Sequence, residues 1–276
     1  MLSRSAHSGA AALPRAAINR IGRQAVAALH DELALYPKPG LVSFVDSGSH
    51  QDMDARTFMR SLFALRQYFP QMVWLGAVAA HFPILEQVGI AAETRMLLAT
   101  EGVNTHRGAI FSLGLLCAGA GALQGEGQRL TPRALRHAVQ DSWGRALGAR
   151  ATNRYAGLRS AGTEAALGFP LLFEVALPAL QQAQAVGLDE QRARLQALFH
   201  IIAKLDDTNL VHRGGLAGLR FAQAAARDYL DAGGAAHPEG VNRAVELHRV
   251  FVARRLSPGG AADMLACACW LQRVCT

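Results

Sequence analysis

The chain of 276 residues has few aromatic side chains and only two lysines, Lys38 and Lys204. Its formal net charge of +7 therefore rests on arginines, which are scattered along the sequence. No run of like charge resembles the arms with which proteins bind nucleic acids, so we expect no nucleic-acid partner. Dispersed arginines suit a pocket for a small polyanion such as a nucleotide, because guanidinium binds phosphate oxygens in a bidentate way, and they suit a solvated surface equally well.

Long apolar runs and paired cysteine motifs are also missing. No stretch reaches the roughly 20 apolar residues of a membrane span, and the best candidate, residues 109–123, is rich in Gly and Ala, as a buried helix is. The four cysteines form no C-x-x-C pair, which favours reduced core thiols. No acidic residue precedes Asp31, and the N-terminus lacks the apolar core of a secretory signal. We expect a flexible tail over residues 1–16, no membrane attachment and a cytoplasmic location.

Ala and Leu dominate the sequence while β-branched residues are sparse, so intrinsic propensities favour helix. A hydrophobic content of 51% is ample for a buried core. We predict an all-α fold, a single domain over residues 17–276 with about ten helices separated by polar breaks. Asp54, Thr131 and Ser257 are the expected N-caps of three of them. The expected helices cover residues 17–35, 55–69, 71–80, 84–99, 106–123, 132–147, 163–186 with a kink or division, 190–204, 216–230, 238–255 and a last one from 258.

The break at residues 100–111 carries the densest set of polar groups. Asn104, Thr105, His106 and Arg107 follow a glycine turn between two apolar segments. Several donors at one backbone corner are what an anionic ligand requires. An ordinary helix start, capped by Asn104 or Thr105, explains the same residues.

Other breaks repeat this chemistry. Lys38 lies between two prolines, either as a point charge for a phosphate or as a solvated turn lysine. In residues 46–54, His50 and Asp52 could bind Mg²⁺, serve as a base, or simply satisfy the loop. The break at 206–215 adds adjacent acids, an amide, an arginine and glycines: Asp206, Asp207, Asn209, Arg213 and Gly214.

Loops of like chemistry in a helical bundle can gather and line a single pocket, which we consider more economical than several unrelated polar turns. The cations suit phosphates and the acids suit Mg²⁺, so together they predict a Mg²⁺–nucleotide site. No G-x-x-x-x-G-K-[ST] sequence is present, which argues against an ordinary P-loop ATPase.

Six ordered segments resemble the motifs of the triphosphoribosyl-dephospho-CoA synthases, over residues from about 20 to 270: 37–42, 48–54, 102–108, 207–209, 213–215 and 257–263. Departures are Glu101 in place of a glycine, Arg107 in place of a lysine, and Gly162 in place of an arginine. The resemblance implies an all-helical enzyme that joins ATP to 3′-dephospho-CoA with loss of adenine. Its product is the prosthetic-group precursor of the acyl carrier protein of malonate decarboxylase or citrate lyase, and the loops look closer to the malonate decarboxylase branch.

Roles for individual residues follow as hypotheses from this resemblance. A ribose hydroxyl of dephospho-CoA would attack C1′ of the ATP ribose while the triphosphate stays intact, through an oxocarbenium-like state. Proton transfer or charge stabilisation falls to His50, Glu93, His106 and Glu164, and Mg²⁺ to two or more of Asp52, Asp54, Asp206 and Asp207. Nucleotide contacts fall to Lys38, Asn104, Thr105, Arg107, Asn209, Arg213, Gly214 and Ser257.

Two other functions remain open at this point. A phosphotransferase or ATPase in the same pocket would release ADP or AMP, and a non-catalytic assembly partner of a carrier-protein complex would turn nothing over. Clustered acids and cations argue against the assembly partner, because a scaffold has no use for buried charges. The resemblance also implies hand-over of the product to a transferase that modifies the carrier protein, and it leaves a homo-oligomer open.

Overall fold

The structure, a computed structural model, describes residues 13–152, 155 and 157–275. Within these ranges it contains helices and no strand, which confirms the predicted all-α fold. The α-helices are α1 (Arg15–Ala34), α2 (Ala55–Leu65), α3 (Tyr68–Ala77), α4 (Phe82–Ala99), α5 (Arg107–Gly125), α6 (Pro132–Arg150), α7 (Ala161–Ala166), α8 (Leu177–Ala185), α9 (Glu190–Lys204), α10 (Thr208–Asp231), α11 (Gly240–Ala253) and α12 (Gly259–Val274). The predicted flexible tail lies mostly outside the described residues.

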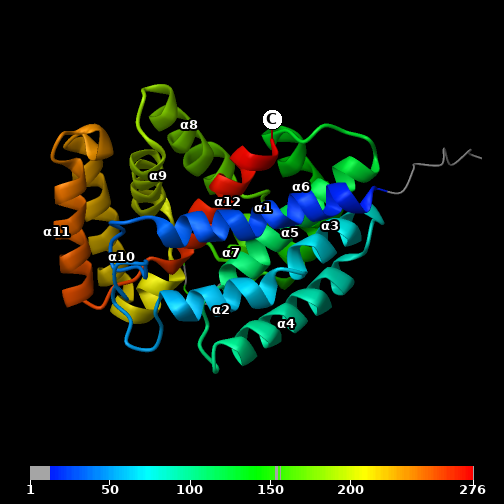
Figure 1. Cartoon of the computed structure of the whole chain (residues 1–276), viewed down its shortest axis with the longest axis horizontal. Helices are drawn as coiled ribbons and strands as arrows, with labels where there is room; N and C mark the ends of the chain where they lie inside the picture. Colours follow the sequence, from blue (N-terminus) through cyan, green and yellow to red (C-terminus); the bar gives the residue numbers. More distant parts are fainter. Residues whose placement is uncertain (1–12, 153–154, 156, 276) are drawn as a thin grey trace, which may run out of the picture.

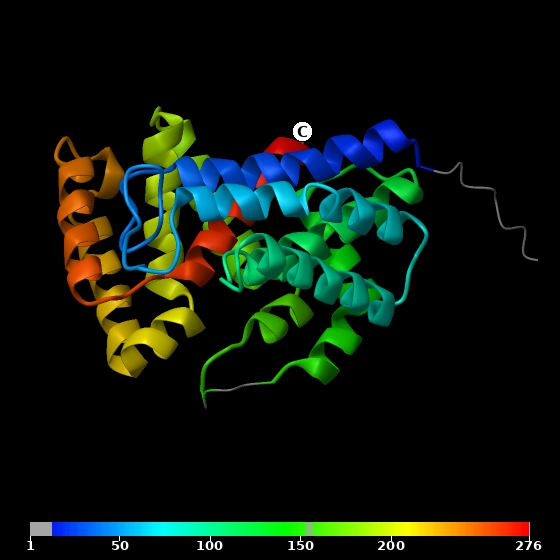
Figure 2. The same cartoon turned by 60° about the horizontal axis from the view of Figure 1, so that its bottom comes forward.

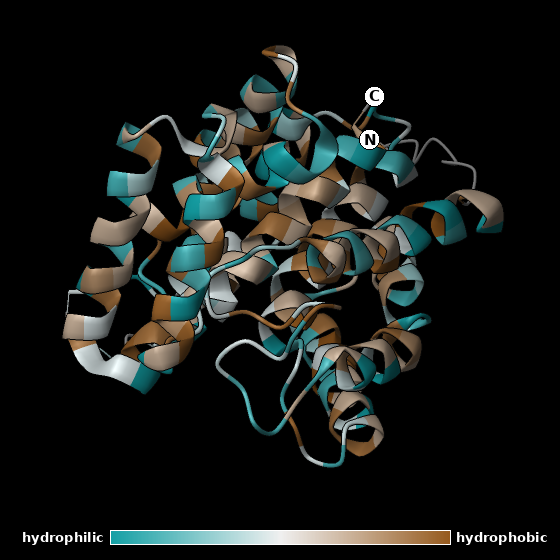
Figure 3. Cartoon of the chain, turned by 60° about the vertical axis from the view of Figure 1, so that its left-hand side comes forward, coloured by the Kyte–Doolittle hydropathy of each residue, from teal (hydrophilic) through white to brown (hydrophobic). Residues whose placement is uncertain are grey.

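Helix α1 runs along the molecule, with α10 and α11 at one end and α3 and α6 at the other (Figure 1). Helix α12 packs beside α1, where the indole N–H of Trp270 donates to the carbonyl of Ile21 at 3.2 Å. Hydrophobic and hydrophilic residues alternate within the turns of many helices (Figure 3), as expected of amphipathic helices around a core. The buried apolar residues form one contiguous cluster that draws on helices from both halves of the chain.

The centre of this core is α5, which packs very closely on α3. A Cβ on Gly76 would lie 1.8 Å from the carbonyl oxygen of Ala118, and one on Gly121 would lie 1.9 Å from that of Val73. Only glycine permits such an approach of two helix backbones. Helix α5 is long and apolar enough to cross a membrane, yet 72% of its most apolar window is buried inside the protein, as predicted for residues 109–123.

Several predicted helix ends are confirmed. Helix α9 covers the expected residues 190–204. Asp54 caps α2 with a capping box, and Thr131 caps α6 with Pro132 at the first position. The division expected within 163–186 is present, with a π-helical turn at Leu172–Ala176 before α8.

Other ends differ from the prediction. Helix α6 continues to Arg150, beyond the predicted residue 147. Helix α10 begins at Thr208, because Asp207 caps it, and the backbone leaves helical geometry at Gly215 (φ 64°). Ser257 was predicted to cap the last helix; instead Pro258 precedes α12, without a side-chain cap, and the Ser257 hydroxyl pairs with His50.

Candidate active site

A cavity of about 960 Å³ lies where the polar helix breaks meet. Its wall includes residues from the breaks after α1, α4, α6 and α11 and from the first two turns of α10, which confirms the predicted convergence of polar loops on one pocket. Ten of the predicted site residues line it: His50, Asp52, Glu93, Asn104, Thr105, His106, Arg107, Asn209, Arg213 and Ser257. Six do not, as far as the described residues define the wall: Lys38, Asp54, Glu164, Asp206, Asp207 and Gly214.

Side chain to backbone hydrogen bonds hold the breaks together. The Ser49 hydroxyl donates to the carbonyl of Leu256 at 2.6 Å. The guanidinium of Arg213 donates to the carbonyl of Arg255 at 2.8 Å and to that of Ser49. Figure 2 shows the result: the loop that follows α1 lies next to the chain that enters α12.

His106 and Thr105 present unpartnered polar atoms at the cavity. The His106 ring is buried, with Nδ1 hydrogen-bonded to the Ser61 hydroxyl at 2.7 Å and the ring edge-on to Phe58. Its Nε2, like the Thr105 hydroxyl, is buried and has no hydrogen-bond partner in the described part of the chain. Burial, helped by the charge of Lys38, lowers the pKa of His106 to about 3, so the imidazole is neutral at physiological pH. Two buried orphan groups on one wall point to a polar ligand, since leaving them unpaired is costly.

Arg107 lines the cavity and is partly exposed to solvent. Its guanidinium forms an ion pair with Glu93, and its side chain remains 58% exposed. The Asn104 side chain accepts a hydrogen bond from the Arg107 backbone N–H at 3.1 Å, so part of the predicted capping role of Asn104 is present. The amide nitrogen of Asn104 is left to contact a ligand.

His50 is a second imidazole in the lining of the cavity. Its Nε2 is 2.9 Å from the Ser257 hydroxyl, and its Nδ1 lies 3.4 Å from a carboxylate oxygen of Asp52. Burial, followed by the nearby charge of Arg213, lowers the pKa of His50. A neutral imidazole next to a carboxylate is the arrangement of a general base.

Three helices begin at this cavity. Gly108 of α5, Asn209 of α10 and both first glycines of α12 (Gly259 and Gly260) line it. Part of the N–H groups at these starts is already taken, since Asp207 accepts those of Asn209, Leu210 and Ala261 and Asp263 accepts that of Ala109. The positive dipole ends of the three helices still favour an anion. The cavity therefore suits a phosphate chain, to which Arg107 and Arg213 add full charges.

Asp263 belongs to this site, although its segment is marked in the sequence only as a motif and a helix start. It lines the cavity from the second turn of α12, and its carboxylate accepts the Ala109 N–H at the start of α5. Burial, with added repulsion from Glu32 and Asp207, raises the pKa of Asp263 well above its usual range. A Cβ on its neighbour Gly108 would lie 2.0 Å from the Asp263 carboxylate, and this contact joins segments far apart in the sequence, so no local pattern could reveal it.

Lys38 is not at the cavity surface. Its ammonium group is buried, donates to the Glu32 carbonyl at 2.7 Å and forms an ion pair with the Glu32 carboxylate. Glu32 itself lines the cavity. The structure therefore replaces the expected lysine–phosphate contact with an internal pair that neutralises a cavity carboxylate, because the turn folds Lys38 back onto the last turn of α1.

Asp207, a predicted Mg²⁺ ligand, holds two helix starts together. Its Oδ1 accepts the N–H groups of Asn209 (2.9 Å) and Leu210 (3.4 Å), and its Oδ2 accepts that of Ala261 at 3.0 Å. The carboxylate is buried, which raises its pKa to about 6 despite these hydrogen bonds. Its oxygens are thus committed to the backbone of α10 and α12.

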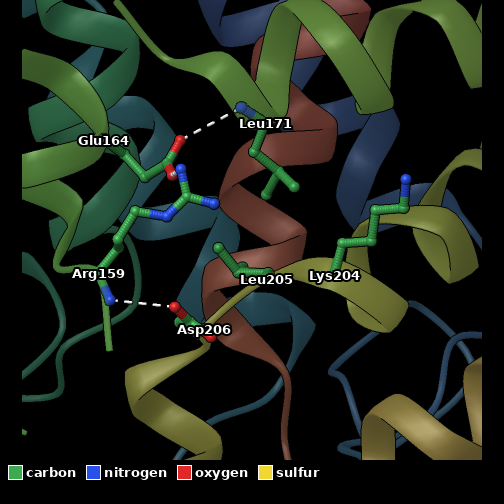
Figure 4. Close-up of a pocket in the computed structure, with 6 residues that line it drawn as sticks. All are labelled: Arg159, Glu164, Leu171, Lys204, Leu205 and Asp206. Carbon is green, nitrogen blue, oxygen red and sulfur yellow. Dashed lines mark hydrogen bonds and ion pairs between the residues drawn. The ribbon is translucent and has the colours of Figure 1, made fainter. Parts of the chain in front are cut away.

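Glu164 and Asp206 form a separate cluster around Arg159 (Figure 4). The Arg159 guanidinium contacts the Glu164 carboxylate at 2.9 Å, and its backbone N–H donates to Asp206 at 3.0 Å. Glu164 also accepts the Leu171 N–H at 3.2 Å. These contacts tie the segment before α7 to the link between α9 and α10, which explains why neither acid reaches the main cavity.

The four acids predicted to bind Mg²⁺ are dispersed. Asp54 is occupied by Thr57 at the start of α2, and only Asp52 of the four lines the cavity. No group of three or more His, Cys, Asp or Glu residues that could hold a metal occurs among the described residues. This donor set does not fit a Mg²⁺ site built from protein ligands.

Gly214, predicted to contact the nucleotide, does not line the cavity either. A Cβ at this position would meet the Leu256 side chain at 2.6 Å.

Comparison with known proteins places this site in a family. The model of the ATP:dephospho-CoA triphosphoribosyl transferase family matches residues 18–276. A 2-(5''-triphosphoribosyl)-3'-dephosphocoenzyme-A synthase of Pectobacterium atrosepticum is 40% identical over 269 residues, which cover 91% of this chain and 87% of that protein. A probable synthase of the same name in Azotobacter vinelandii is 42% identical over 280 residues, covering 96% and 94%. No solved structure matches. The chain belongs to the ATP:dephospho-CoA triphosphoribosyl transferase family.

Proposed function

We propose that this chain transfers the triphosphoribosyl group of ATP to 3′-dephospho-CoA. The N-glycosidic bond between adenine and C1′ of the ATP ribose breaks, and a bond from C1′ to a ribose hydroxyl oxygen of dephospho-CoA forms. The hydroxyl proton is lost and adenine leaves protonated in its place. The observation that carries the proposal is the cavity wall at Thr105 and His106, where two buried polar atoms await a ligand in a chain of this family.

The triphosphate must be held without being cleaved. Arg107 and Arg213 and the starts of α5, α10 and α12 supply positive potential to the cavity. Asn104, Thr105, Asn209 and Ser257 add polar groups to its lining. Mg²⁺ would enter with ATP, bound chiefly by phosphate and water oxygens, with Asp52 as the available carboxylate of the predicted set.

Proton transfer divides between two sides of the cavity. His50, next to Asp52, is placed to take the proton of the attacking hydroxyl. Asp263, whose raised pKa keeps it protonated, is placed to protonate the departing adenine. His106, held neutral, hydrogen-bonds the ligand through Nε2, and Glu93 faces the positive charge that develops on the ribose.

The biological context extends the proposal. The loop sequences favour the malonate decarboxylase branch over the citrate lyase branch. The product is consumed by a transferase that attaches it to an acyl carrier protein, and both steps take place in the cytoplasm. A homo-oligomer is compatible with this scheme.

Incubation of the purified protein with ATP, Mg²⁺ and 3′-dephospho-CoA tests the activity. Chromatography is expected to show free adenine and the triphosphoribosyl product in equal amounts, with both substrates required. Release of ADP or AMP in place of adenine would contradict the proposal and favour a phosphotransferase or ATPase. Absence of turnover with intact nucleotide binding would favour an assembly partner.

A further inference from the structure

One part of the cavity lining is apolar, in contrast to the polar lining at the helix breaks. Away from the polar breaks, the cavity is lined by apolar side chains of α3, α4 and α5, namely Met72, Phe82, Leu85, Ile90, Phe111 and Leu115. Ile90 keeps 59% of its side chain exposed, as an apolar contact surface does before a ligand covers it. The volume of about 960 Å³ is also at the upper end of the range for small-molecule pockets, as two substrates require.

Among the described residues, the apolar side chains of this wall are accompanied by no unpaired cation for a phosphate. The hydroxyl of Tyr68 is used in a hydrogen bond to the Ile110 carbonyl at 2.9 Å. Of the charged groups that line the cavity from α4 and α6, Glu93 is paired with Arg107, and Glu86 and Arg150 form an ion pair at 2.8 Å, with the Arg150 guanidinium 5.5 Å from the ring centre of Phe82. A triphosphate against this wall would lose its hydration without compensation.

The two substrates of the proposed reaction differ in one part, and the chemistry of that part matches the apolar wall. Both carry an adenosine and a phosphate chain, but dephospho-CoA alone carries a pantetheine arm, an uncharged chain of methylene, methyl and amide groups that ends in a thiol. Resting on the proposed function, we propose that the wall of α3, α4 and α5 is the pantetheine subsite, which binds the arm of dephospho-CoA and distinguishes the acceptor from ATP. The rim pair, Glu86 and Arg150, lies where it can hydrogen-bond an amide of the arm.

Gly89 of α4 keeps this subsite open. It lines the cavity in the middle of a helix, and the atom nearest to a Cβ built there is the Tyr68 hydroxyl at 3.7 Å, an ordinary contact distance. The Cβ of a larger residue at position 89 therefore meets no backbone of another segment within 4 Å, and the side chain would occupy part of the cavity that Gly89 lines. Glycine within a helix is otherwise unfavourable relative to alanine.

The test is Gly89→Leu, with Gly148→Leu as the matched control. Gly148 is also a glycine of a helix, α6; it is exposed, a Cβ there meets only Ala166 at 3.8 Å, and it does not line the cavity. Calorimetric titration of each protein with 3′-dephospho-CoA, with ATP and with ADP, which lacks the arm, gives the dissociation constants. Thermal melting confirms that both variants fold.

Gly89→Leu is expected to weaken dephospho-CoA binding by about tenfold or more, while ATP and ADP binding and the melting temperature stay close to wild type. Gly148→Leu is expected to change none of these. Unchanged dephospho-CoA binding in Gly89→Leu, or an equal loss of ATP and ADP binding, would overturn the subsite. A second variant, Ile90→Asp, places a charge on the same wall and is expected to cause the same selective loss.

Adenine release separates this inference from the proposed function. Wild-type protein that releases adenine, with an unchanged KM for dephospho-CoA in Gly89→Leu, would refute the subsite and leave the transferase function intact. Wild-type protein that releases no adenine, yet loses dephospho-CoA binding selectively in Gly89→Leu, would refute the function and support the subsite.

Discussion

Gly108 and Asp263 lie in direct contact across the interface of α5 and α12: a Cβ on Gly108 would be 2.0 Å from Oδ2 of Asp263. The carboxylate thus sits against the first turn of α5, where it also accepts the Ala109 N–H. The contact joins the break at 100–111 to the break at 257–263 and fixes a protonatable group between two helix starts at the cavity.

Replacement of Gly108 by alanine tests this contact. Helix propensity alone predicts a gain of roughly 0.5–1 kcal/mol, but the displaced carboxylate is expected to cost about 1–3 kcal/mol in the free energy of unfolding and most of the adenine release. Urea unfolding and an adenine assay measure both effects. Gly89→Ala, whose Cβ would meet only the Tyr68 hydroxyl at an ordinary contact distance of 3.7 Å, is the control and should be as stable as wild type or more so. A stable, active Gly108→Ala protein would show that Asp263 needs no fixed position.

Asp263→Asn keeps the shape of the side chain and removes its proton transfer. We expect kcat to fall by about 10²–10⁴-fold, the range for loss of a general acid, with KM for ATP little changed. In the wild type, kcat should fall as the pH rises through the raised pKa of Asp263, and this limb should be missing in the variant. Glu164→Gln, in the separate cluster with Arg159, is the control and is expected to keep kcat within about twofold of wild type. A large loss of kcat in Glu164→Gln with little loss in Asp263→Asn would contradict this assignment and place the reaction at the Arg159–Glu164 cluster.

His106→Phe retains a ring against Phe58 and removes the free Nε2. A loss of about tenfold in kcat/KM for ATP is expected, as for one ligand hydrogen bond. Because the pKa of His106 is lowered to about 3, the folded state binds fewer protons than the unfolded state below about pH 6.5. Wild-type stability should therefore decline as the pH falls from about 6.5 toward 3, and His106→Phe should decline less. Parallel stability curves for the two proteins would contradict the buried neutral imidazole.

Asp207→Asn leaves the Ala261 N–H without its carboxylate acceptor, which we expect to cost about 1–3 kcal/mol of stability. The folded-state pKa of about 6 is above the unfolded value, so ionisation destabilises the wild type as the pH rises from about 4 to 6. The deficit of Asp207→Asn should therefore be largest near pH 4 and shrink toward pH 7. Residual adenine release should keep its wild-type Mg²⁺ dependence; a shifted dependence would restore Asp207 as a metal ligand.

The sequence predicted what local chemistry determines. Asp54 and Thr131 cap helices because a side-chain oxygen within three residues suffices, and α9 has strong signals at both ends. The convergence of the polar loops could be predicted as well, because the breaks between helices of a bundle lie at its few ends and are therefore close to one another. Ten of the sixteen residues proposed for the site line one cavity, so the composition of the breaks was informative.

The predictions that were wrong concern the direction in which a side chain points once the helices have packed. Lys38 and Glu32 are six residues apart, and only the folded turn brings the ammonium back to the helix. Asp206 and Asp207 are adjacent, yet one carboxylate contacts Arg159 and the other the start of α12. Asp263 was overlooked because its partner Gly108 lies far away in the sequence, and no local pattern marks a contact between two helices.

The most direct measurement is a crystal structure of Asp263→Asn, in which catalysis is slowed, with ATP, Mg²⁺ and 3′-dephospho-CoA. We predict the triphosphate next to Arg107, Arg213 and the starts of α5 and α12, adenine at the Thr105–His106 wall, and the pantetheine arm along α4. A nucleotide bound at the Arg159–Glu164 cluster, or outside the cavity altogether, would contradict the central claim that the converging breaks form the transferase site.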